Sequence, residues 1–456
     1  MAVQLMDSVI FGRVFANDDV KAIFDERGVI ESWLLFEKTL AKVQAELGII
    51  PKKSAEEINR KANFHYVSLE KIGQYFHETA LASVALIKAL KETCSADTGE
   101  YIHYGPTTQD LYDTSLAIRL IKFMPLLMTD LKQVRDLLFK LCVKHKNTLM
   151  IGRTHGRQAI PITFGFKMAI QAETFNTHLK RAREIYPRIA IGSLSGAVGT
   201  YSSFKAISKV NPLELEKKVL AELGLEAPII SCQPSIERYC EFLNFLSLIS
   251  VSVEKFAQDL FTMQRDEIAE IKESPGGDEK ISSSTMPHKQ NPKGLELILG
   301  ISKLIRSYSH ALMETSMKDE RDRSPFWVED IAIPEACVLT STILGTLKNI
   351  LENLEIFPEV MEKNVYITKG LIMAENIMIA LSKKTGRKES AHKLITESVK
   401  EAVKKNLPFE KVLLNNKKIR KYLSPKEIKE ALDPSKYVGL IEDLIKRVSE
   451  TCQRKD

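Results

Sequence analysis

The chain has 456 residues, 44% of them hydrophobic and 27% charged, a composition typical of a soluble protein of one to three domains. Lys and Arg outnumber Asp and Glu by 65 to 59. Because this surplus is spread along the chain, it gives no reason to expect a nucleic-acid partner, and it suits a small anionic substrate.

Apolar residues at helical spacing dominate the chain, and alternating strand patterns are scarce. Residues 1–106 hold short helical patterns and end in the loop TGEYIHYGP. Five long helical tracts follow, at residues 107–144, 162–186, 236–273, 293–320 and 334–357. We expect Pro125 to interrupt the first of them. From about residue 358 the pattern changes to short, lysine-rich helices.

These patterns predict an all-α fold of three domains, at residues 1–106, 107–357 and 358–456, with a long helical bundle in the middle one. The tract at 236–273 is apolar on much of its circumference. A helix of this kind commonly finds its remaining cover on another subunit, so we expect an oligomer.

Polar residues gather in three loops at the ends of the long tracts. YIHYGPTTQDLYDT, at 101–114, places His103 before a Gly-Pro turn, and Thr107 or Thr108 can cap the next helix. GRTHGRQAIP, at 152–161, places His155 between two glycines. On the residues alone, a helix cap and a structural histidine explain these two loops at least as well as a catalytic site does.

The third loop is ESPGGDEKISSSTMPHKQNPKGLE, at 273–296. Its Pro-Gly-Gly entry permits movement, so we expect a mobile lid, and a solvated linker is the alternative. Serine, threonine, histidine and lysine together can abstract a proton, neutralise a carboxylate and protonate a leaving group. The spacing alone does not tell which of these steps occurs.

Other site patterns are missing from the sequence. It contains no GxxxxGK[ST], GxGxxG, HExxH or GxSxG motif. The six cysteines show no CxxC or Cys/His ligand spacing, so we expect reduced thiols and no metal site. The N-terminus has no signal-peptide pattern, and no apolar run approaches the roughly 18 residues that span a bilayer. We therefore expect a soluble, cytoplasmic protein with no membrane partner.

The third loop resembles the GSSxMPxKxNP loop of the fumarase, aspartase and argininosuccinate lyase superfamily, and the other two loops are similar to its further motifs, in the same order. The resemblance implies a homotetramer with a twenty-helix core and active sites built from three subunits. It also implies anti β-elimination, usually releasing fumarate from a dicarboxylate-bearing substrate, without a metal or organic cofactor. GRTHGRQA, HYGPTTQDLYDT and HETALASVALIKAL resemble the adenylosuccinate lyase branch, which implies cleavage of a C–N bond in purine biosynthesis.

The resemblance assigns roles to residues at the matching positions. Ser283 would remove the proton next to a carboxylate, and Lys289 and Asn291 would hold that carboxylate. His155 would protonate the leaving nitrogen, oriented by Glu296. The other matching positions, assigned to substrate binding, are His77, His103, Thr107, Thr108, Gln233, Ser284, Met286 and Arg321.

Some residues depart from the pattern of this branch. Phe326 and Asp330 fall where a serine and an arginine bind the nucleotide phosphate, so the leaving group stays open. SPFWVEDIAIPE and the N-terminal region resemble 3-carboxy-cis,cis-muconate cycloisomerase. Bacterial cycloisomerases commonly lack the histidines at 77 and 155, which this chain keeps, and elimination is therefore favoured. The alternatives are another succinyl-adduct lyase, a cycloisomerase and a non-enzymatic helical scaffold.

Overall fold

The computed structural model describes residues 4–15, 17–233, 235–274, 286, 289–315, 321–322 and 324–453. The chain forms two compact units, each built from three stretches of sequence. Unit 1 comprises Met1–Asp130, His178–Glu254 and Leu299–Gly345. Unit 2 comprises Leu131–Thr177, Lys255–Ile298 and Thr346–Asp456. The three-domain division expected from the sequence stays a prediction.

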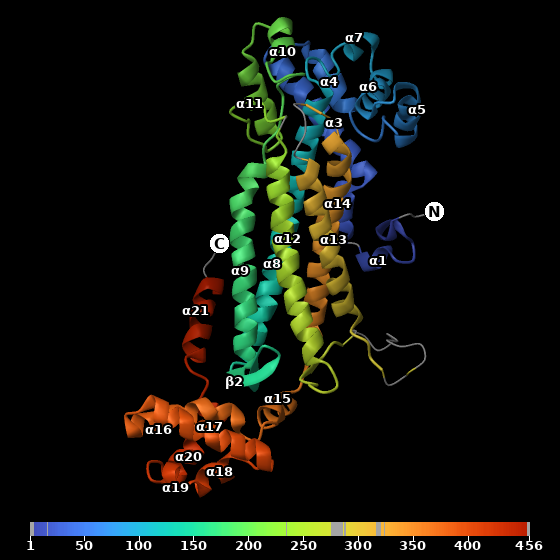
Figure 1. Cartoon of the computed structure of the whole chain (residues 1–456). Coiled ribbons are helices and arrows are strands. Elements are labelled where there is room, and N and C mark those ends of the chain that lie inside the picture. Colours follow the sequence, from blue (N-terminus) through green and yellow to red (C-terminus); the bar gives the residue numbers. More distant parts are fainter. Residues whose placement is uncertain are drawn as a thin grey trace. The chain divides into compact units, whose positions relative to one another are not determined.

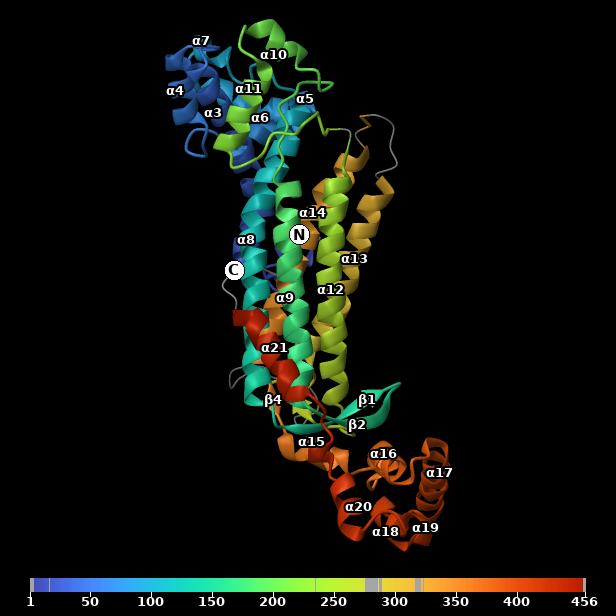
Figure 2. The same ribbon diagram turned by 90° about the vertical axis from the view of Figure 1, so that its left-hand side faces the viewer.

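Five long helices contribute residues to both units, and within each unit their segments run side by side (Figures 1 and 2). They are α8 Thr108–Lys144, α9 Phe164–Ile189, α12 Glu237–Met263, α13 Lys293–Thr315 and α14 Ser324–Glu352. The predicted all-α fold with a long helical bundle is confirmed.

Three prolines lie inside these helices: Pro125 in α8, Pro187 in α9 and Pro334 in α14. Pro125 does not interrupt α8, and α14 begins before Pro334 rather than at it. A proline inside a helix removes one backbone hydrogen bond. Residues next to Pro125 are fully buried, among them Met124 and Leu127, so packing offsets that loss.

Unit 1 is completed by shorter helices, most of which share one core with the start of α8. They are η1 Leu5–Asp7, α1 Gly12–Phe15, α2 Asp18–Phe24, α3 Glu26–Glu46, α4 Lys52–Lys61, α5 Leu69–Thr79, α6 Ala82–Thr93, α7 Ala96–Gly99, α10 Ser202–Ile207 and α11 Pro212–Glu222. Phe36, Leu86, Leu111 and Leu220 lie in this core with less than 1% of their surface exposed.

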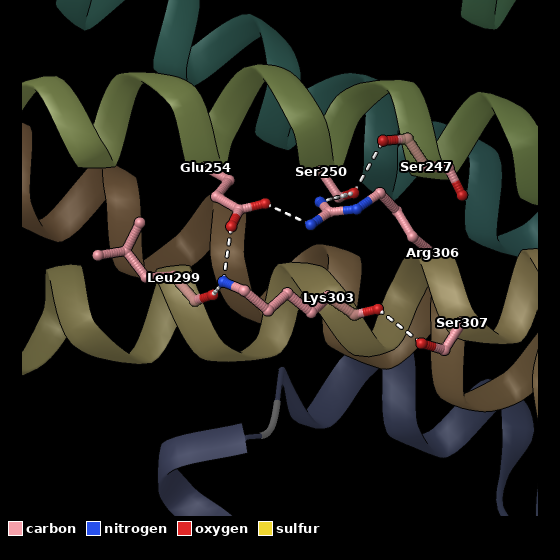
Figure 3. Close-up of polar contacts among 7 residues, drawn as sticks. All are labelled: Ser247, Ser250, Glu254, Leu299, Lys303, Arg306 and Ser307. Atoms are coloured by element: carbon pink, nitrogen blue, oxygen red, sulfur yellow. Dashed lines mark hydrogen bonds and ion pairs between the residues drawn. The ribbon is translucent and has the colours of Figure 1, made fainter.

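A polar cluster joins α12 to α13 within unit 1. In Figure 3, Glu254 on α12 points toward two cations on α13. Its carboxylate oxygens lie 2.7 Å from Lys303 Nζ and 2.5 Å from Arg306 Nη2, and Arg306 also donates to Ser250 Oγ at 3.3 Å. Burial opposes ionisation of Glu254, but the two cations outweigh it and lower the pKa of this carboxyl below its ordinary value.

Unit 2 contains the strands that the sequence did not reveal. β1 Leu149–Thr154 pairs antiparallel with β2 Arg157–Thr163, and His155 and Gly156 form the turn between them with φ values of 51° and 70°. The second sheet pairs β3 Ile271–Lys272 with β4 Glu355–Ile356. β3 lies within the tract expected to be helical to 273, where α12 instead ends at Met263.

The remaining elements of unit 2 are short helices. They are α15 Pro358–Val365, η2 Leu371–Met373, α16 Ala374–Thr385, α17 Lys388–Lys405, α18 Phe409–Asn415, α19 Lys417–Arg420, α20 Pro425–Ala431, η3 Pro434–Lys436 and α21 Ile441–Gln453. Ile377, Leu381, Phe409 and Ile428 form part of the core that α16 to α20 enclose (Figure 1).

By length and composition alone, α14 could cross a membrane, since an 18-residue window of it has a mean hydropathy of 1.3. However, 67% of that window is buried inside the protein. A core helix of a large domain has this character.

Glu254→Gln should lower the thermal unfolding midpoint by about 1 to 3 °C, because it removes a charge that faces two partly exposed cations. The carboxyl pKa is lowered in the folded state, so the stabilisation is present above the ordinary pKa of 4.5. It is lost as the pH falls through the lowered value. Thermal melts of both proteins at neutral and acidic pH measure this difference.

The matched control is Glu31→Gln, which breaks the exposed ion pair between Glu31 and Arg27. It should leave the midpoint within about 1 °C of the parent. Equal shifts for both variants at neutral pH would show that the α12–α13 cluster adds nothing to stability.

Candidate active site

A pocket of about 180 Å³ opens in unit 1 near the beginnings of α8, α12 and α14. Four residues expected to bind substrate line it together: Thr107, Thr108, Gln233 and Arg321. Its other lining residues are Gln109, Asp113, Ala197, Ser235, Ile236, Arg238, Tyr239, Asp322, Pro325, Phe326 and Glu329. The structure thus brings together residues that are far apart in the sequence.

The buried carboxylate of Asp110 organises one side of this pocket. Its Oδ1 accepts hydrogen bonds from the backbone N–H of Ser195 at 2.9 Å and from Ser193 Oγ at 3.0 Å. Its Oδ2 accepts from the backbone N–H of Thr107 and of Gly196, both at 3.0 Å. One side chain of α8 therefore fixes both the start of its own helix and the loop before α10.

Asp110 also orients Gln233, whose Nε2 donates to Asp110 Oδ1 at 2.9 Å and faces the carbonyl of Gly196 at 3.2 Å. Because Nε2 faces acceptors, the other amide atom is Oε1. This oxygen is buried, and the described residues offer it no hydrogen-bond donor. A buried acceptor of this kind gains a partner when a ligand with an N–H or O–H group enters.

Two arginines give the pocket its positive charge. Arg238 donates to Tyr239 Oη at 2.8 Å and to Cys232 Sγ at 3.1 Å, and Arg321 Nη2 donates to the carbonyl of Val198 at 2.9 Å. Burial opposes the charge of Arg238, but its neighbours, Tyr239 first and then Cys232 and Asp113, outweigh it and raise the pKa of Arg238. The pocket therefore keeps a partly buried cation suited to an anionic substrate.

Phe326 supplies an apolar wall where the related branch has a phosphate-binding serine. Its ring stacks on Tyr112 with centroids 5.0 Å apart and contacts Trp327 edge-on at 5.8 Å. Asp330, at the position of the arginine, is exposed. This side of the pocket therefore presents an aromatic ring.

Two histidines expected at the site do not line this pocket. His103, in the left-handed conformation with φ 57°, lies with Nδ1 2.6 Å from the buried carboxylate of Glu37. Burial opposes the protonated form, but Glu37 outweighs it and raises the pKa of His103. His77 is exposed in the last turn of α5.

His155 is exposed at the turn of the β1–β2 hairpin in unit 2. The strand that leads into this turn carries Arg153, which forms an ion pair with Glu270 at N–O distances of 2.9 and 2.6 Å. Asn364 donates to the same carboxylate at 3.0 Å, and Glu270 is fully buried. Sequence reasoning missed Glu270, because nothing near it in the chain marks a partner 117 residues away.

The other predicted residues of unit 2 lie at and before the start of α13. Met286, Lys289 and Glu296 are exposed, and Asn291 is partly buried. Glu273 accepts hydrogen bonds from the backbone N–H of Gly294 at 2.8 Å and of Leu295 at 3.1 Å, and so caps α13. The remaining two, Ser283 and Ser284, lie outside the described residues.

Asp110→Asn should lower kcat/KM for fumarate release, the reaction expected from the motifs, by about 100-fold or more. The asparagine amide has an NH2 group in place of one carboxylate oxygen, and this donor would face backbone N–H groups that need an acceptor. The loop before α10 and Gln233 would then lose the carboxylate that binds them both. Steady-state kinetics measures the loss. Asp136→Asn, an exposed change on the same helix, is the control, and near-normal turnover of Asp110→Asn would contradict the organising role.

A family model described as lyase matches residues 12–306, and one described as the adenylosuccinate lyase C-terminus matches residues 370–448. The adenylosuccinate lyase of Methanocaldococcus jannaschii is 37% identical, over 97% of this chain and 95% of that protein. The N-acetyl-S-(2-succino)cysteine lyase of Dickeya dadantii is 35% identical, over 96% of this chain and 95% of that protein.

Among solved structures, the 3-carboxy-cis,cis-muconate lactonizing enzyme from Pseudomonas putida matches with a TM-score of 0.90 and 26% identity, covering 98% of this chain and 99% of that chain. These matches confirm the resemblance read from the three motifs. The chain belongs to the fumarase/aspartase lyase superfamily, in the group that carries the adenylosuccinate lyase C-terminal domain.

Proposed function

We propose that the protein is a carbon–nitrogen lyase of the adenylosuccinate lyase type, which releases fumarate from a succinyl adduct by β-elimination and serves purine biosynthesis. The observation that carries this proposal is the pocket of unit 1. There Thr107, Thr108, Gln233 and Arg321 line one pocket, and the carboxylate of Asp110 accepts hydrogen bonds from Thr107 and Gln233. Full-length relatives with this activity in their names support it.

The proposed reaction needs a base, a carboxylate anchor and an acid. Ser283 removes the proton from the carbon next to a carboxylate, and Lys289 with Asn291 stabilises the charge that develops on that carboxylate. The electron pair of the broken C–H bond forms the double bond of fumarate as the C–N bond breaks. His155, oriented by Glu296, gives its proton to the leaving nitrogen.

Serine is ordinarily too weak an acid to act as a base. Its alkoxide therefore needs nearby cations and N–H donors, and Lys289, in the same loop motif as Ser283, is the cation proposed to supply this stabilisation. His103 and His77 complete the substrate site in this proposal, with Ser284 and Met286. Glu37 favours the imidazolium form of His103, which suits contact with a substrate anion.

A second substrate class is favoured by the ring of Phe326. A succinyl thioether gives the same fumarate, with a thiol as leaving group, and needs no phosphate site. The apolar wall of Phe326 stacked on Tyr112 suits such a leaving group. The Dickeya dadantii relative is named for a substrate of this class.

We further propose a homotetramer in the cytoplasm, with residues 1–106, 107–357 and 358–456 as its three domains. Exposed apolar side chains on the long helices support the assembly. On α12 and α13 within unit 1, Leu248, Val251, Leu304 and Met313 are between 42% and 49% exposed. Apolar residues repeated along helix faces in this way are commonly covered by another subunit.

Ser283→Ala and His155→Ala should each lower fumarate release by several orders of magnitude, because each removes a proton-transfer group, and both should keep the assembly intact. Stopped assays of fumarate with size-exclusion chromatography measure both properties. His310→Ala, at an exposed position on α13, is the control and should be normal. Near-normal turnover of either variant would overturn the role assigned to that residue.

The substrate class is tested by supplying adenylosuccinate and N-acetyl-S-(2-succino)cysteine separately. We expect fumarate from adenylosuccinate, and the double change Phe326→Ser with Asp330→Arg should raise its kcat/KM by about tenfold, since it introduces a phosphate-binding cation. The same change should not improve the thioether.

If the parent acts on the thioether and not on adenylosuccinate, the second substrate class replaces the first. If neither compound releases fumarate, the proposed reaction itself is wrong.

A further inference from the structure

A second cavity in unit 1 has a volume of about 620 Å³, and none of the described residues that line it is proposed to transfer a proton or to hold the substrate carboxylate. Small-molecule sites in proteins typically have volumes of roughly 300 to 1,000 Å³. Six aromatic side chains line it: Phe24, Trp33, Phe76, Tyr112, Phe326 and Trp327. Aliphatic residues of α3 and α5, among them Ile30 and Ile72, complete an apolar surface.

One buried cation faces this apolar cavity. Arg119 of α8 lines it and is only 5% exposed. Its Nε donates to the carbonyl of Ser115 at 3.4 Å, and its guanidinium carbon lies 6.0 Å from the ring centroid of Phe24. The described residues place no carboxylate oxygen within 4.0 Å of its guanidinium and offer its two Nη atoms no acceptor.

The acidic residues around the cavity do not take up this cation. Asp113 accepts a hydrogen bond from Gln109 at 2.5 Å, and its charge acts on Arg238 in the neighbouring catalytic pocket. Glu329 likewise acts on Tyr239 there. Glu26 and Asp330 are exposed at the rim, and Asp330 acts on Arg119 only from beyond ion-pair distance.

A buried guanidinium without a carboxylate partner is unfavourable until an anion reaches it. Its two Nη atoms match the two oxygens of a carboxylate. The surrounding rings suit an aromatic or aliphatic body. Burial also lowers the pKa of Arg119, but an arginine keeps its charge at neutral pH.

We propose that this cavity binds a small carboxylic acid with an aromatic or aliphatic body, whose carboxylate pairs with the guanidinium of Arg119. The site is separate from the reacting groups of the proposed lyase reaction. It shares the wall of Gln109, Asp113, Phe326 and Glu329 with the catalytic pocket.

Tryptophan fluorescence reports on this cavity directly, because the chain has two tryptophans, Trp33 and Trp327, and both line it. The full-length protein is titrated with 3-phenylpropionate and with its uncharged analogue, 3-phenylpropanamide. We expect a saturable change with the acid and at least tenfold weaker binding of the amide.

Arg119→Gln should weaken binding of the acid at least tenfold and leave binding of the amide unchanged. Arg27→Gln, which removes an exposed arginine from α3, is the matched control and should bind the acid like the parent. Circular dichroism confirms that each variant is folded.

The proposal is overturned if the parent shows no saturable change with the acid, as it would if another copy of the chain filled the cavity. Equal affinity of the parent for acid and amide also overturns it, and this comparison needs no variant, so it holds even if Arg119→Gln does not fold. Unchanged binding of the acid by folded Arg119→Gln has the same consequence.

Discussion

The candidate site depends on one buried carboxylate, that of Asp110. It receives hydrogen bonds from three backbone N–H groups and two side chains, and these belong to three separate stretches of the sequence. A buried charge is stable in a protein only when it is satisfied in this way. The same bonds hold Gln233 with an unpaired acceptor and place Thr107 at the start of α8, so the cost of burying Asp110 is offset by contacts that also shape the pocket.

In unit 2 a second buried carboxylate plays the equivalent part. Glu270 accepts from Arg153 at the base of the hairpin and from Asn364, and the turn that carries His155 is in the left-handed region. Such a turn is costly for a histidine, and it persists where the surrounding structure fixes it. Asp110 thus holds Gln233 directly, whereas Glu270 binds the strand that leads into the turn of His155.

Local sequence patterns predicted what depends on local physics. Helical periodicity located the five long helices, and the residue types in the third polar loop indicated proton transfer and carboxylate binding. The hairpin around His155 was missed because its pattern is short, and Pro125 was expected to interrupt α8 because the burial that offsets it is not visible in one helix. Asp110, Glu270 and Arg119 owe their roles to partners distant in the chain or to a cavity, and no local pattern encodes either.

In the proposed reaction, the choice of leaving group depends on the residues around Phe326. Phe326 belongs to the wall between the two cavities of unit 1, and its stack on Tyr112 makes that wall apolar. Two relatives of similar identity are named as lyases of different compounds, adenylosuccinate and N-acetyl-S-(2-succino)cysteine.

The central claim is that the pocket organised by Asp110 binds the succinyl adduct. A crystal structure of the Ser283→Ala variant with bound adduct tests it most directly. The adduct is expected to occupy this pocket, to donate a hydrogen bond to Gln233 Oε1 and to leave the bonds between Gln233 and Asp110 in place. An adduct bound elsewhere, or a Gln233 side chain turned away from Asp110 to meet it, would contradict the account.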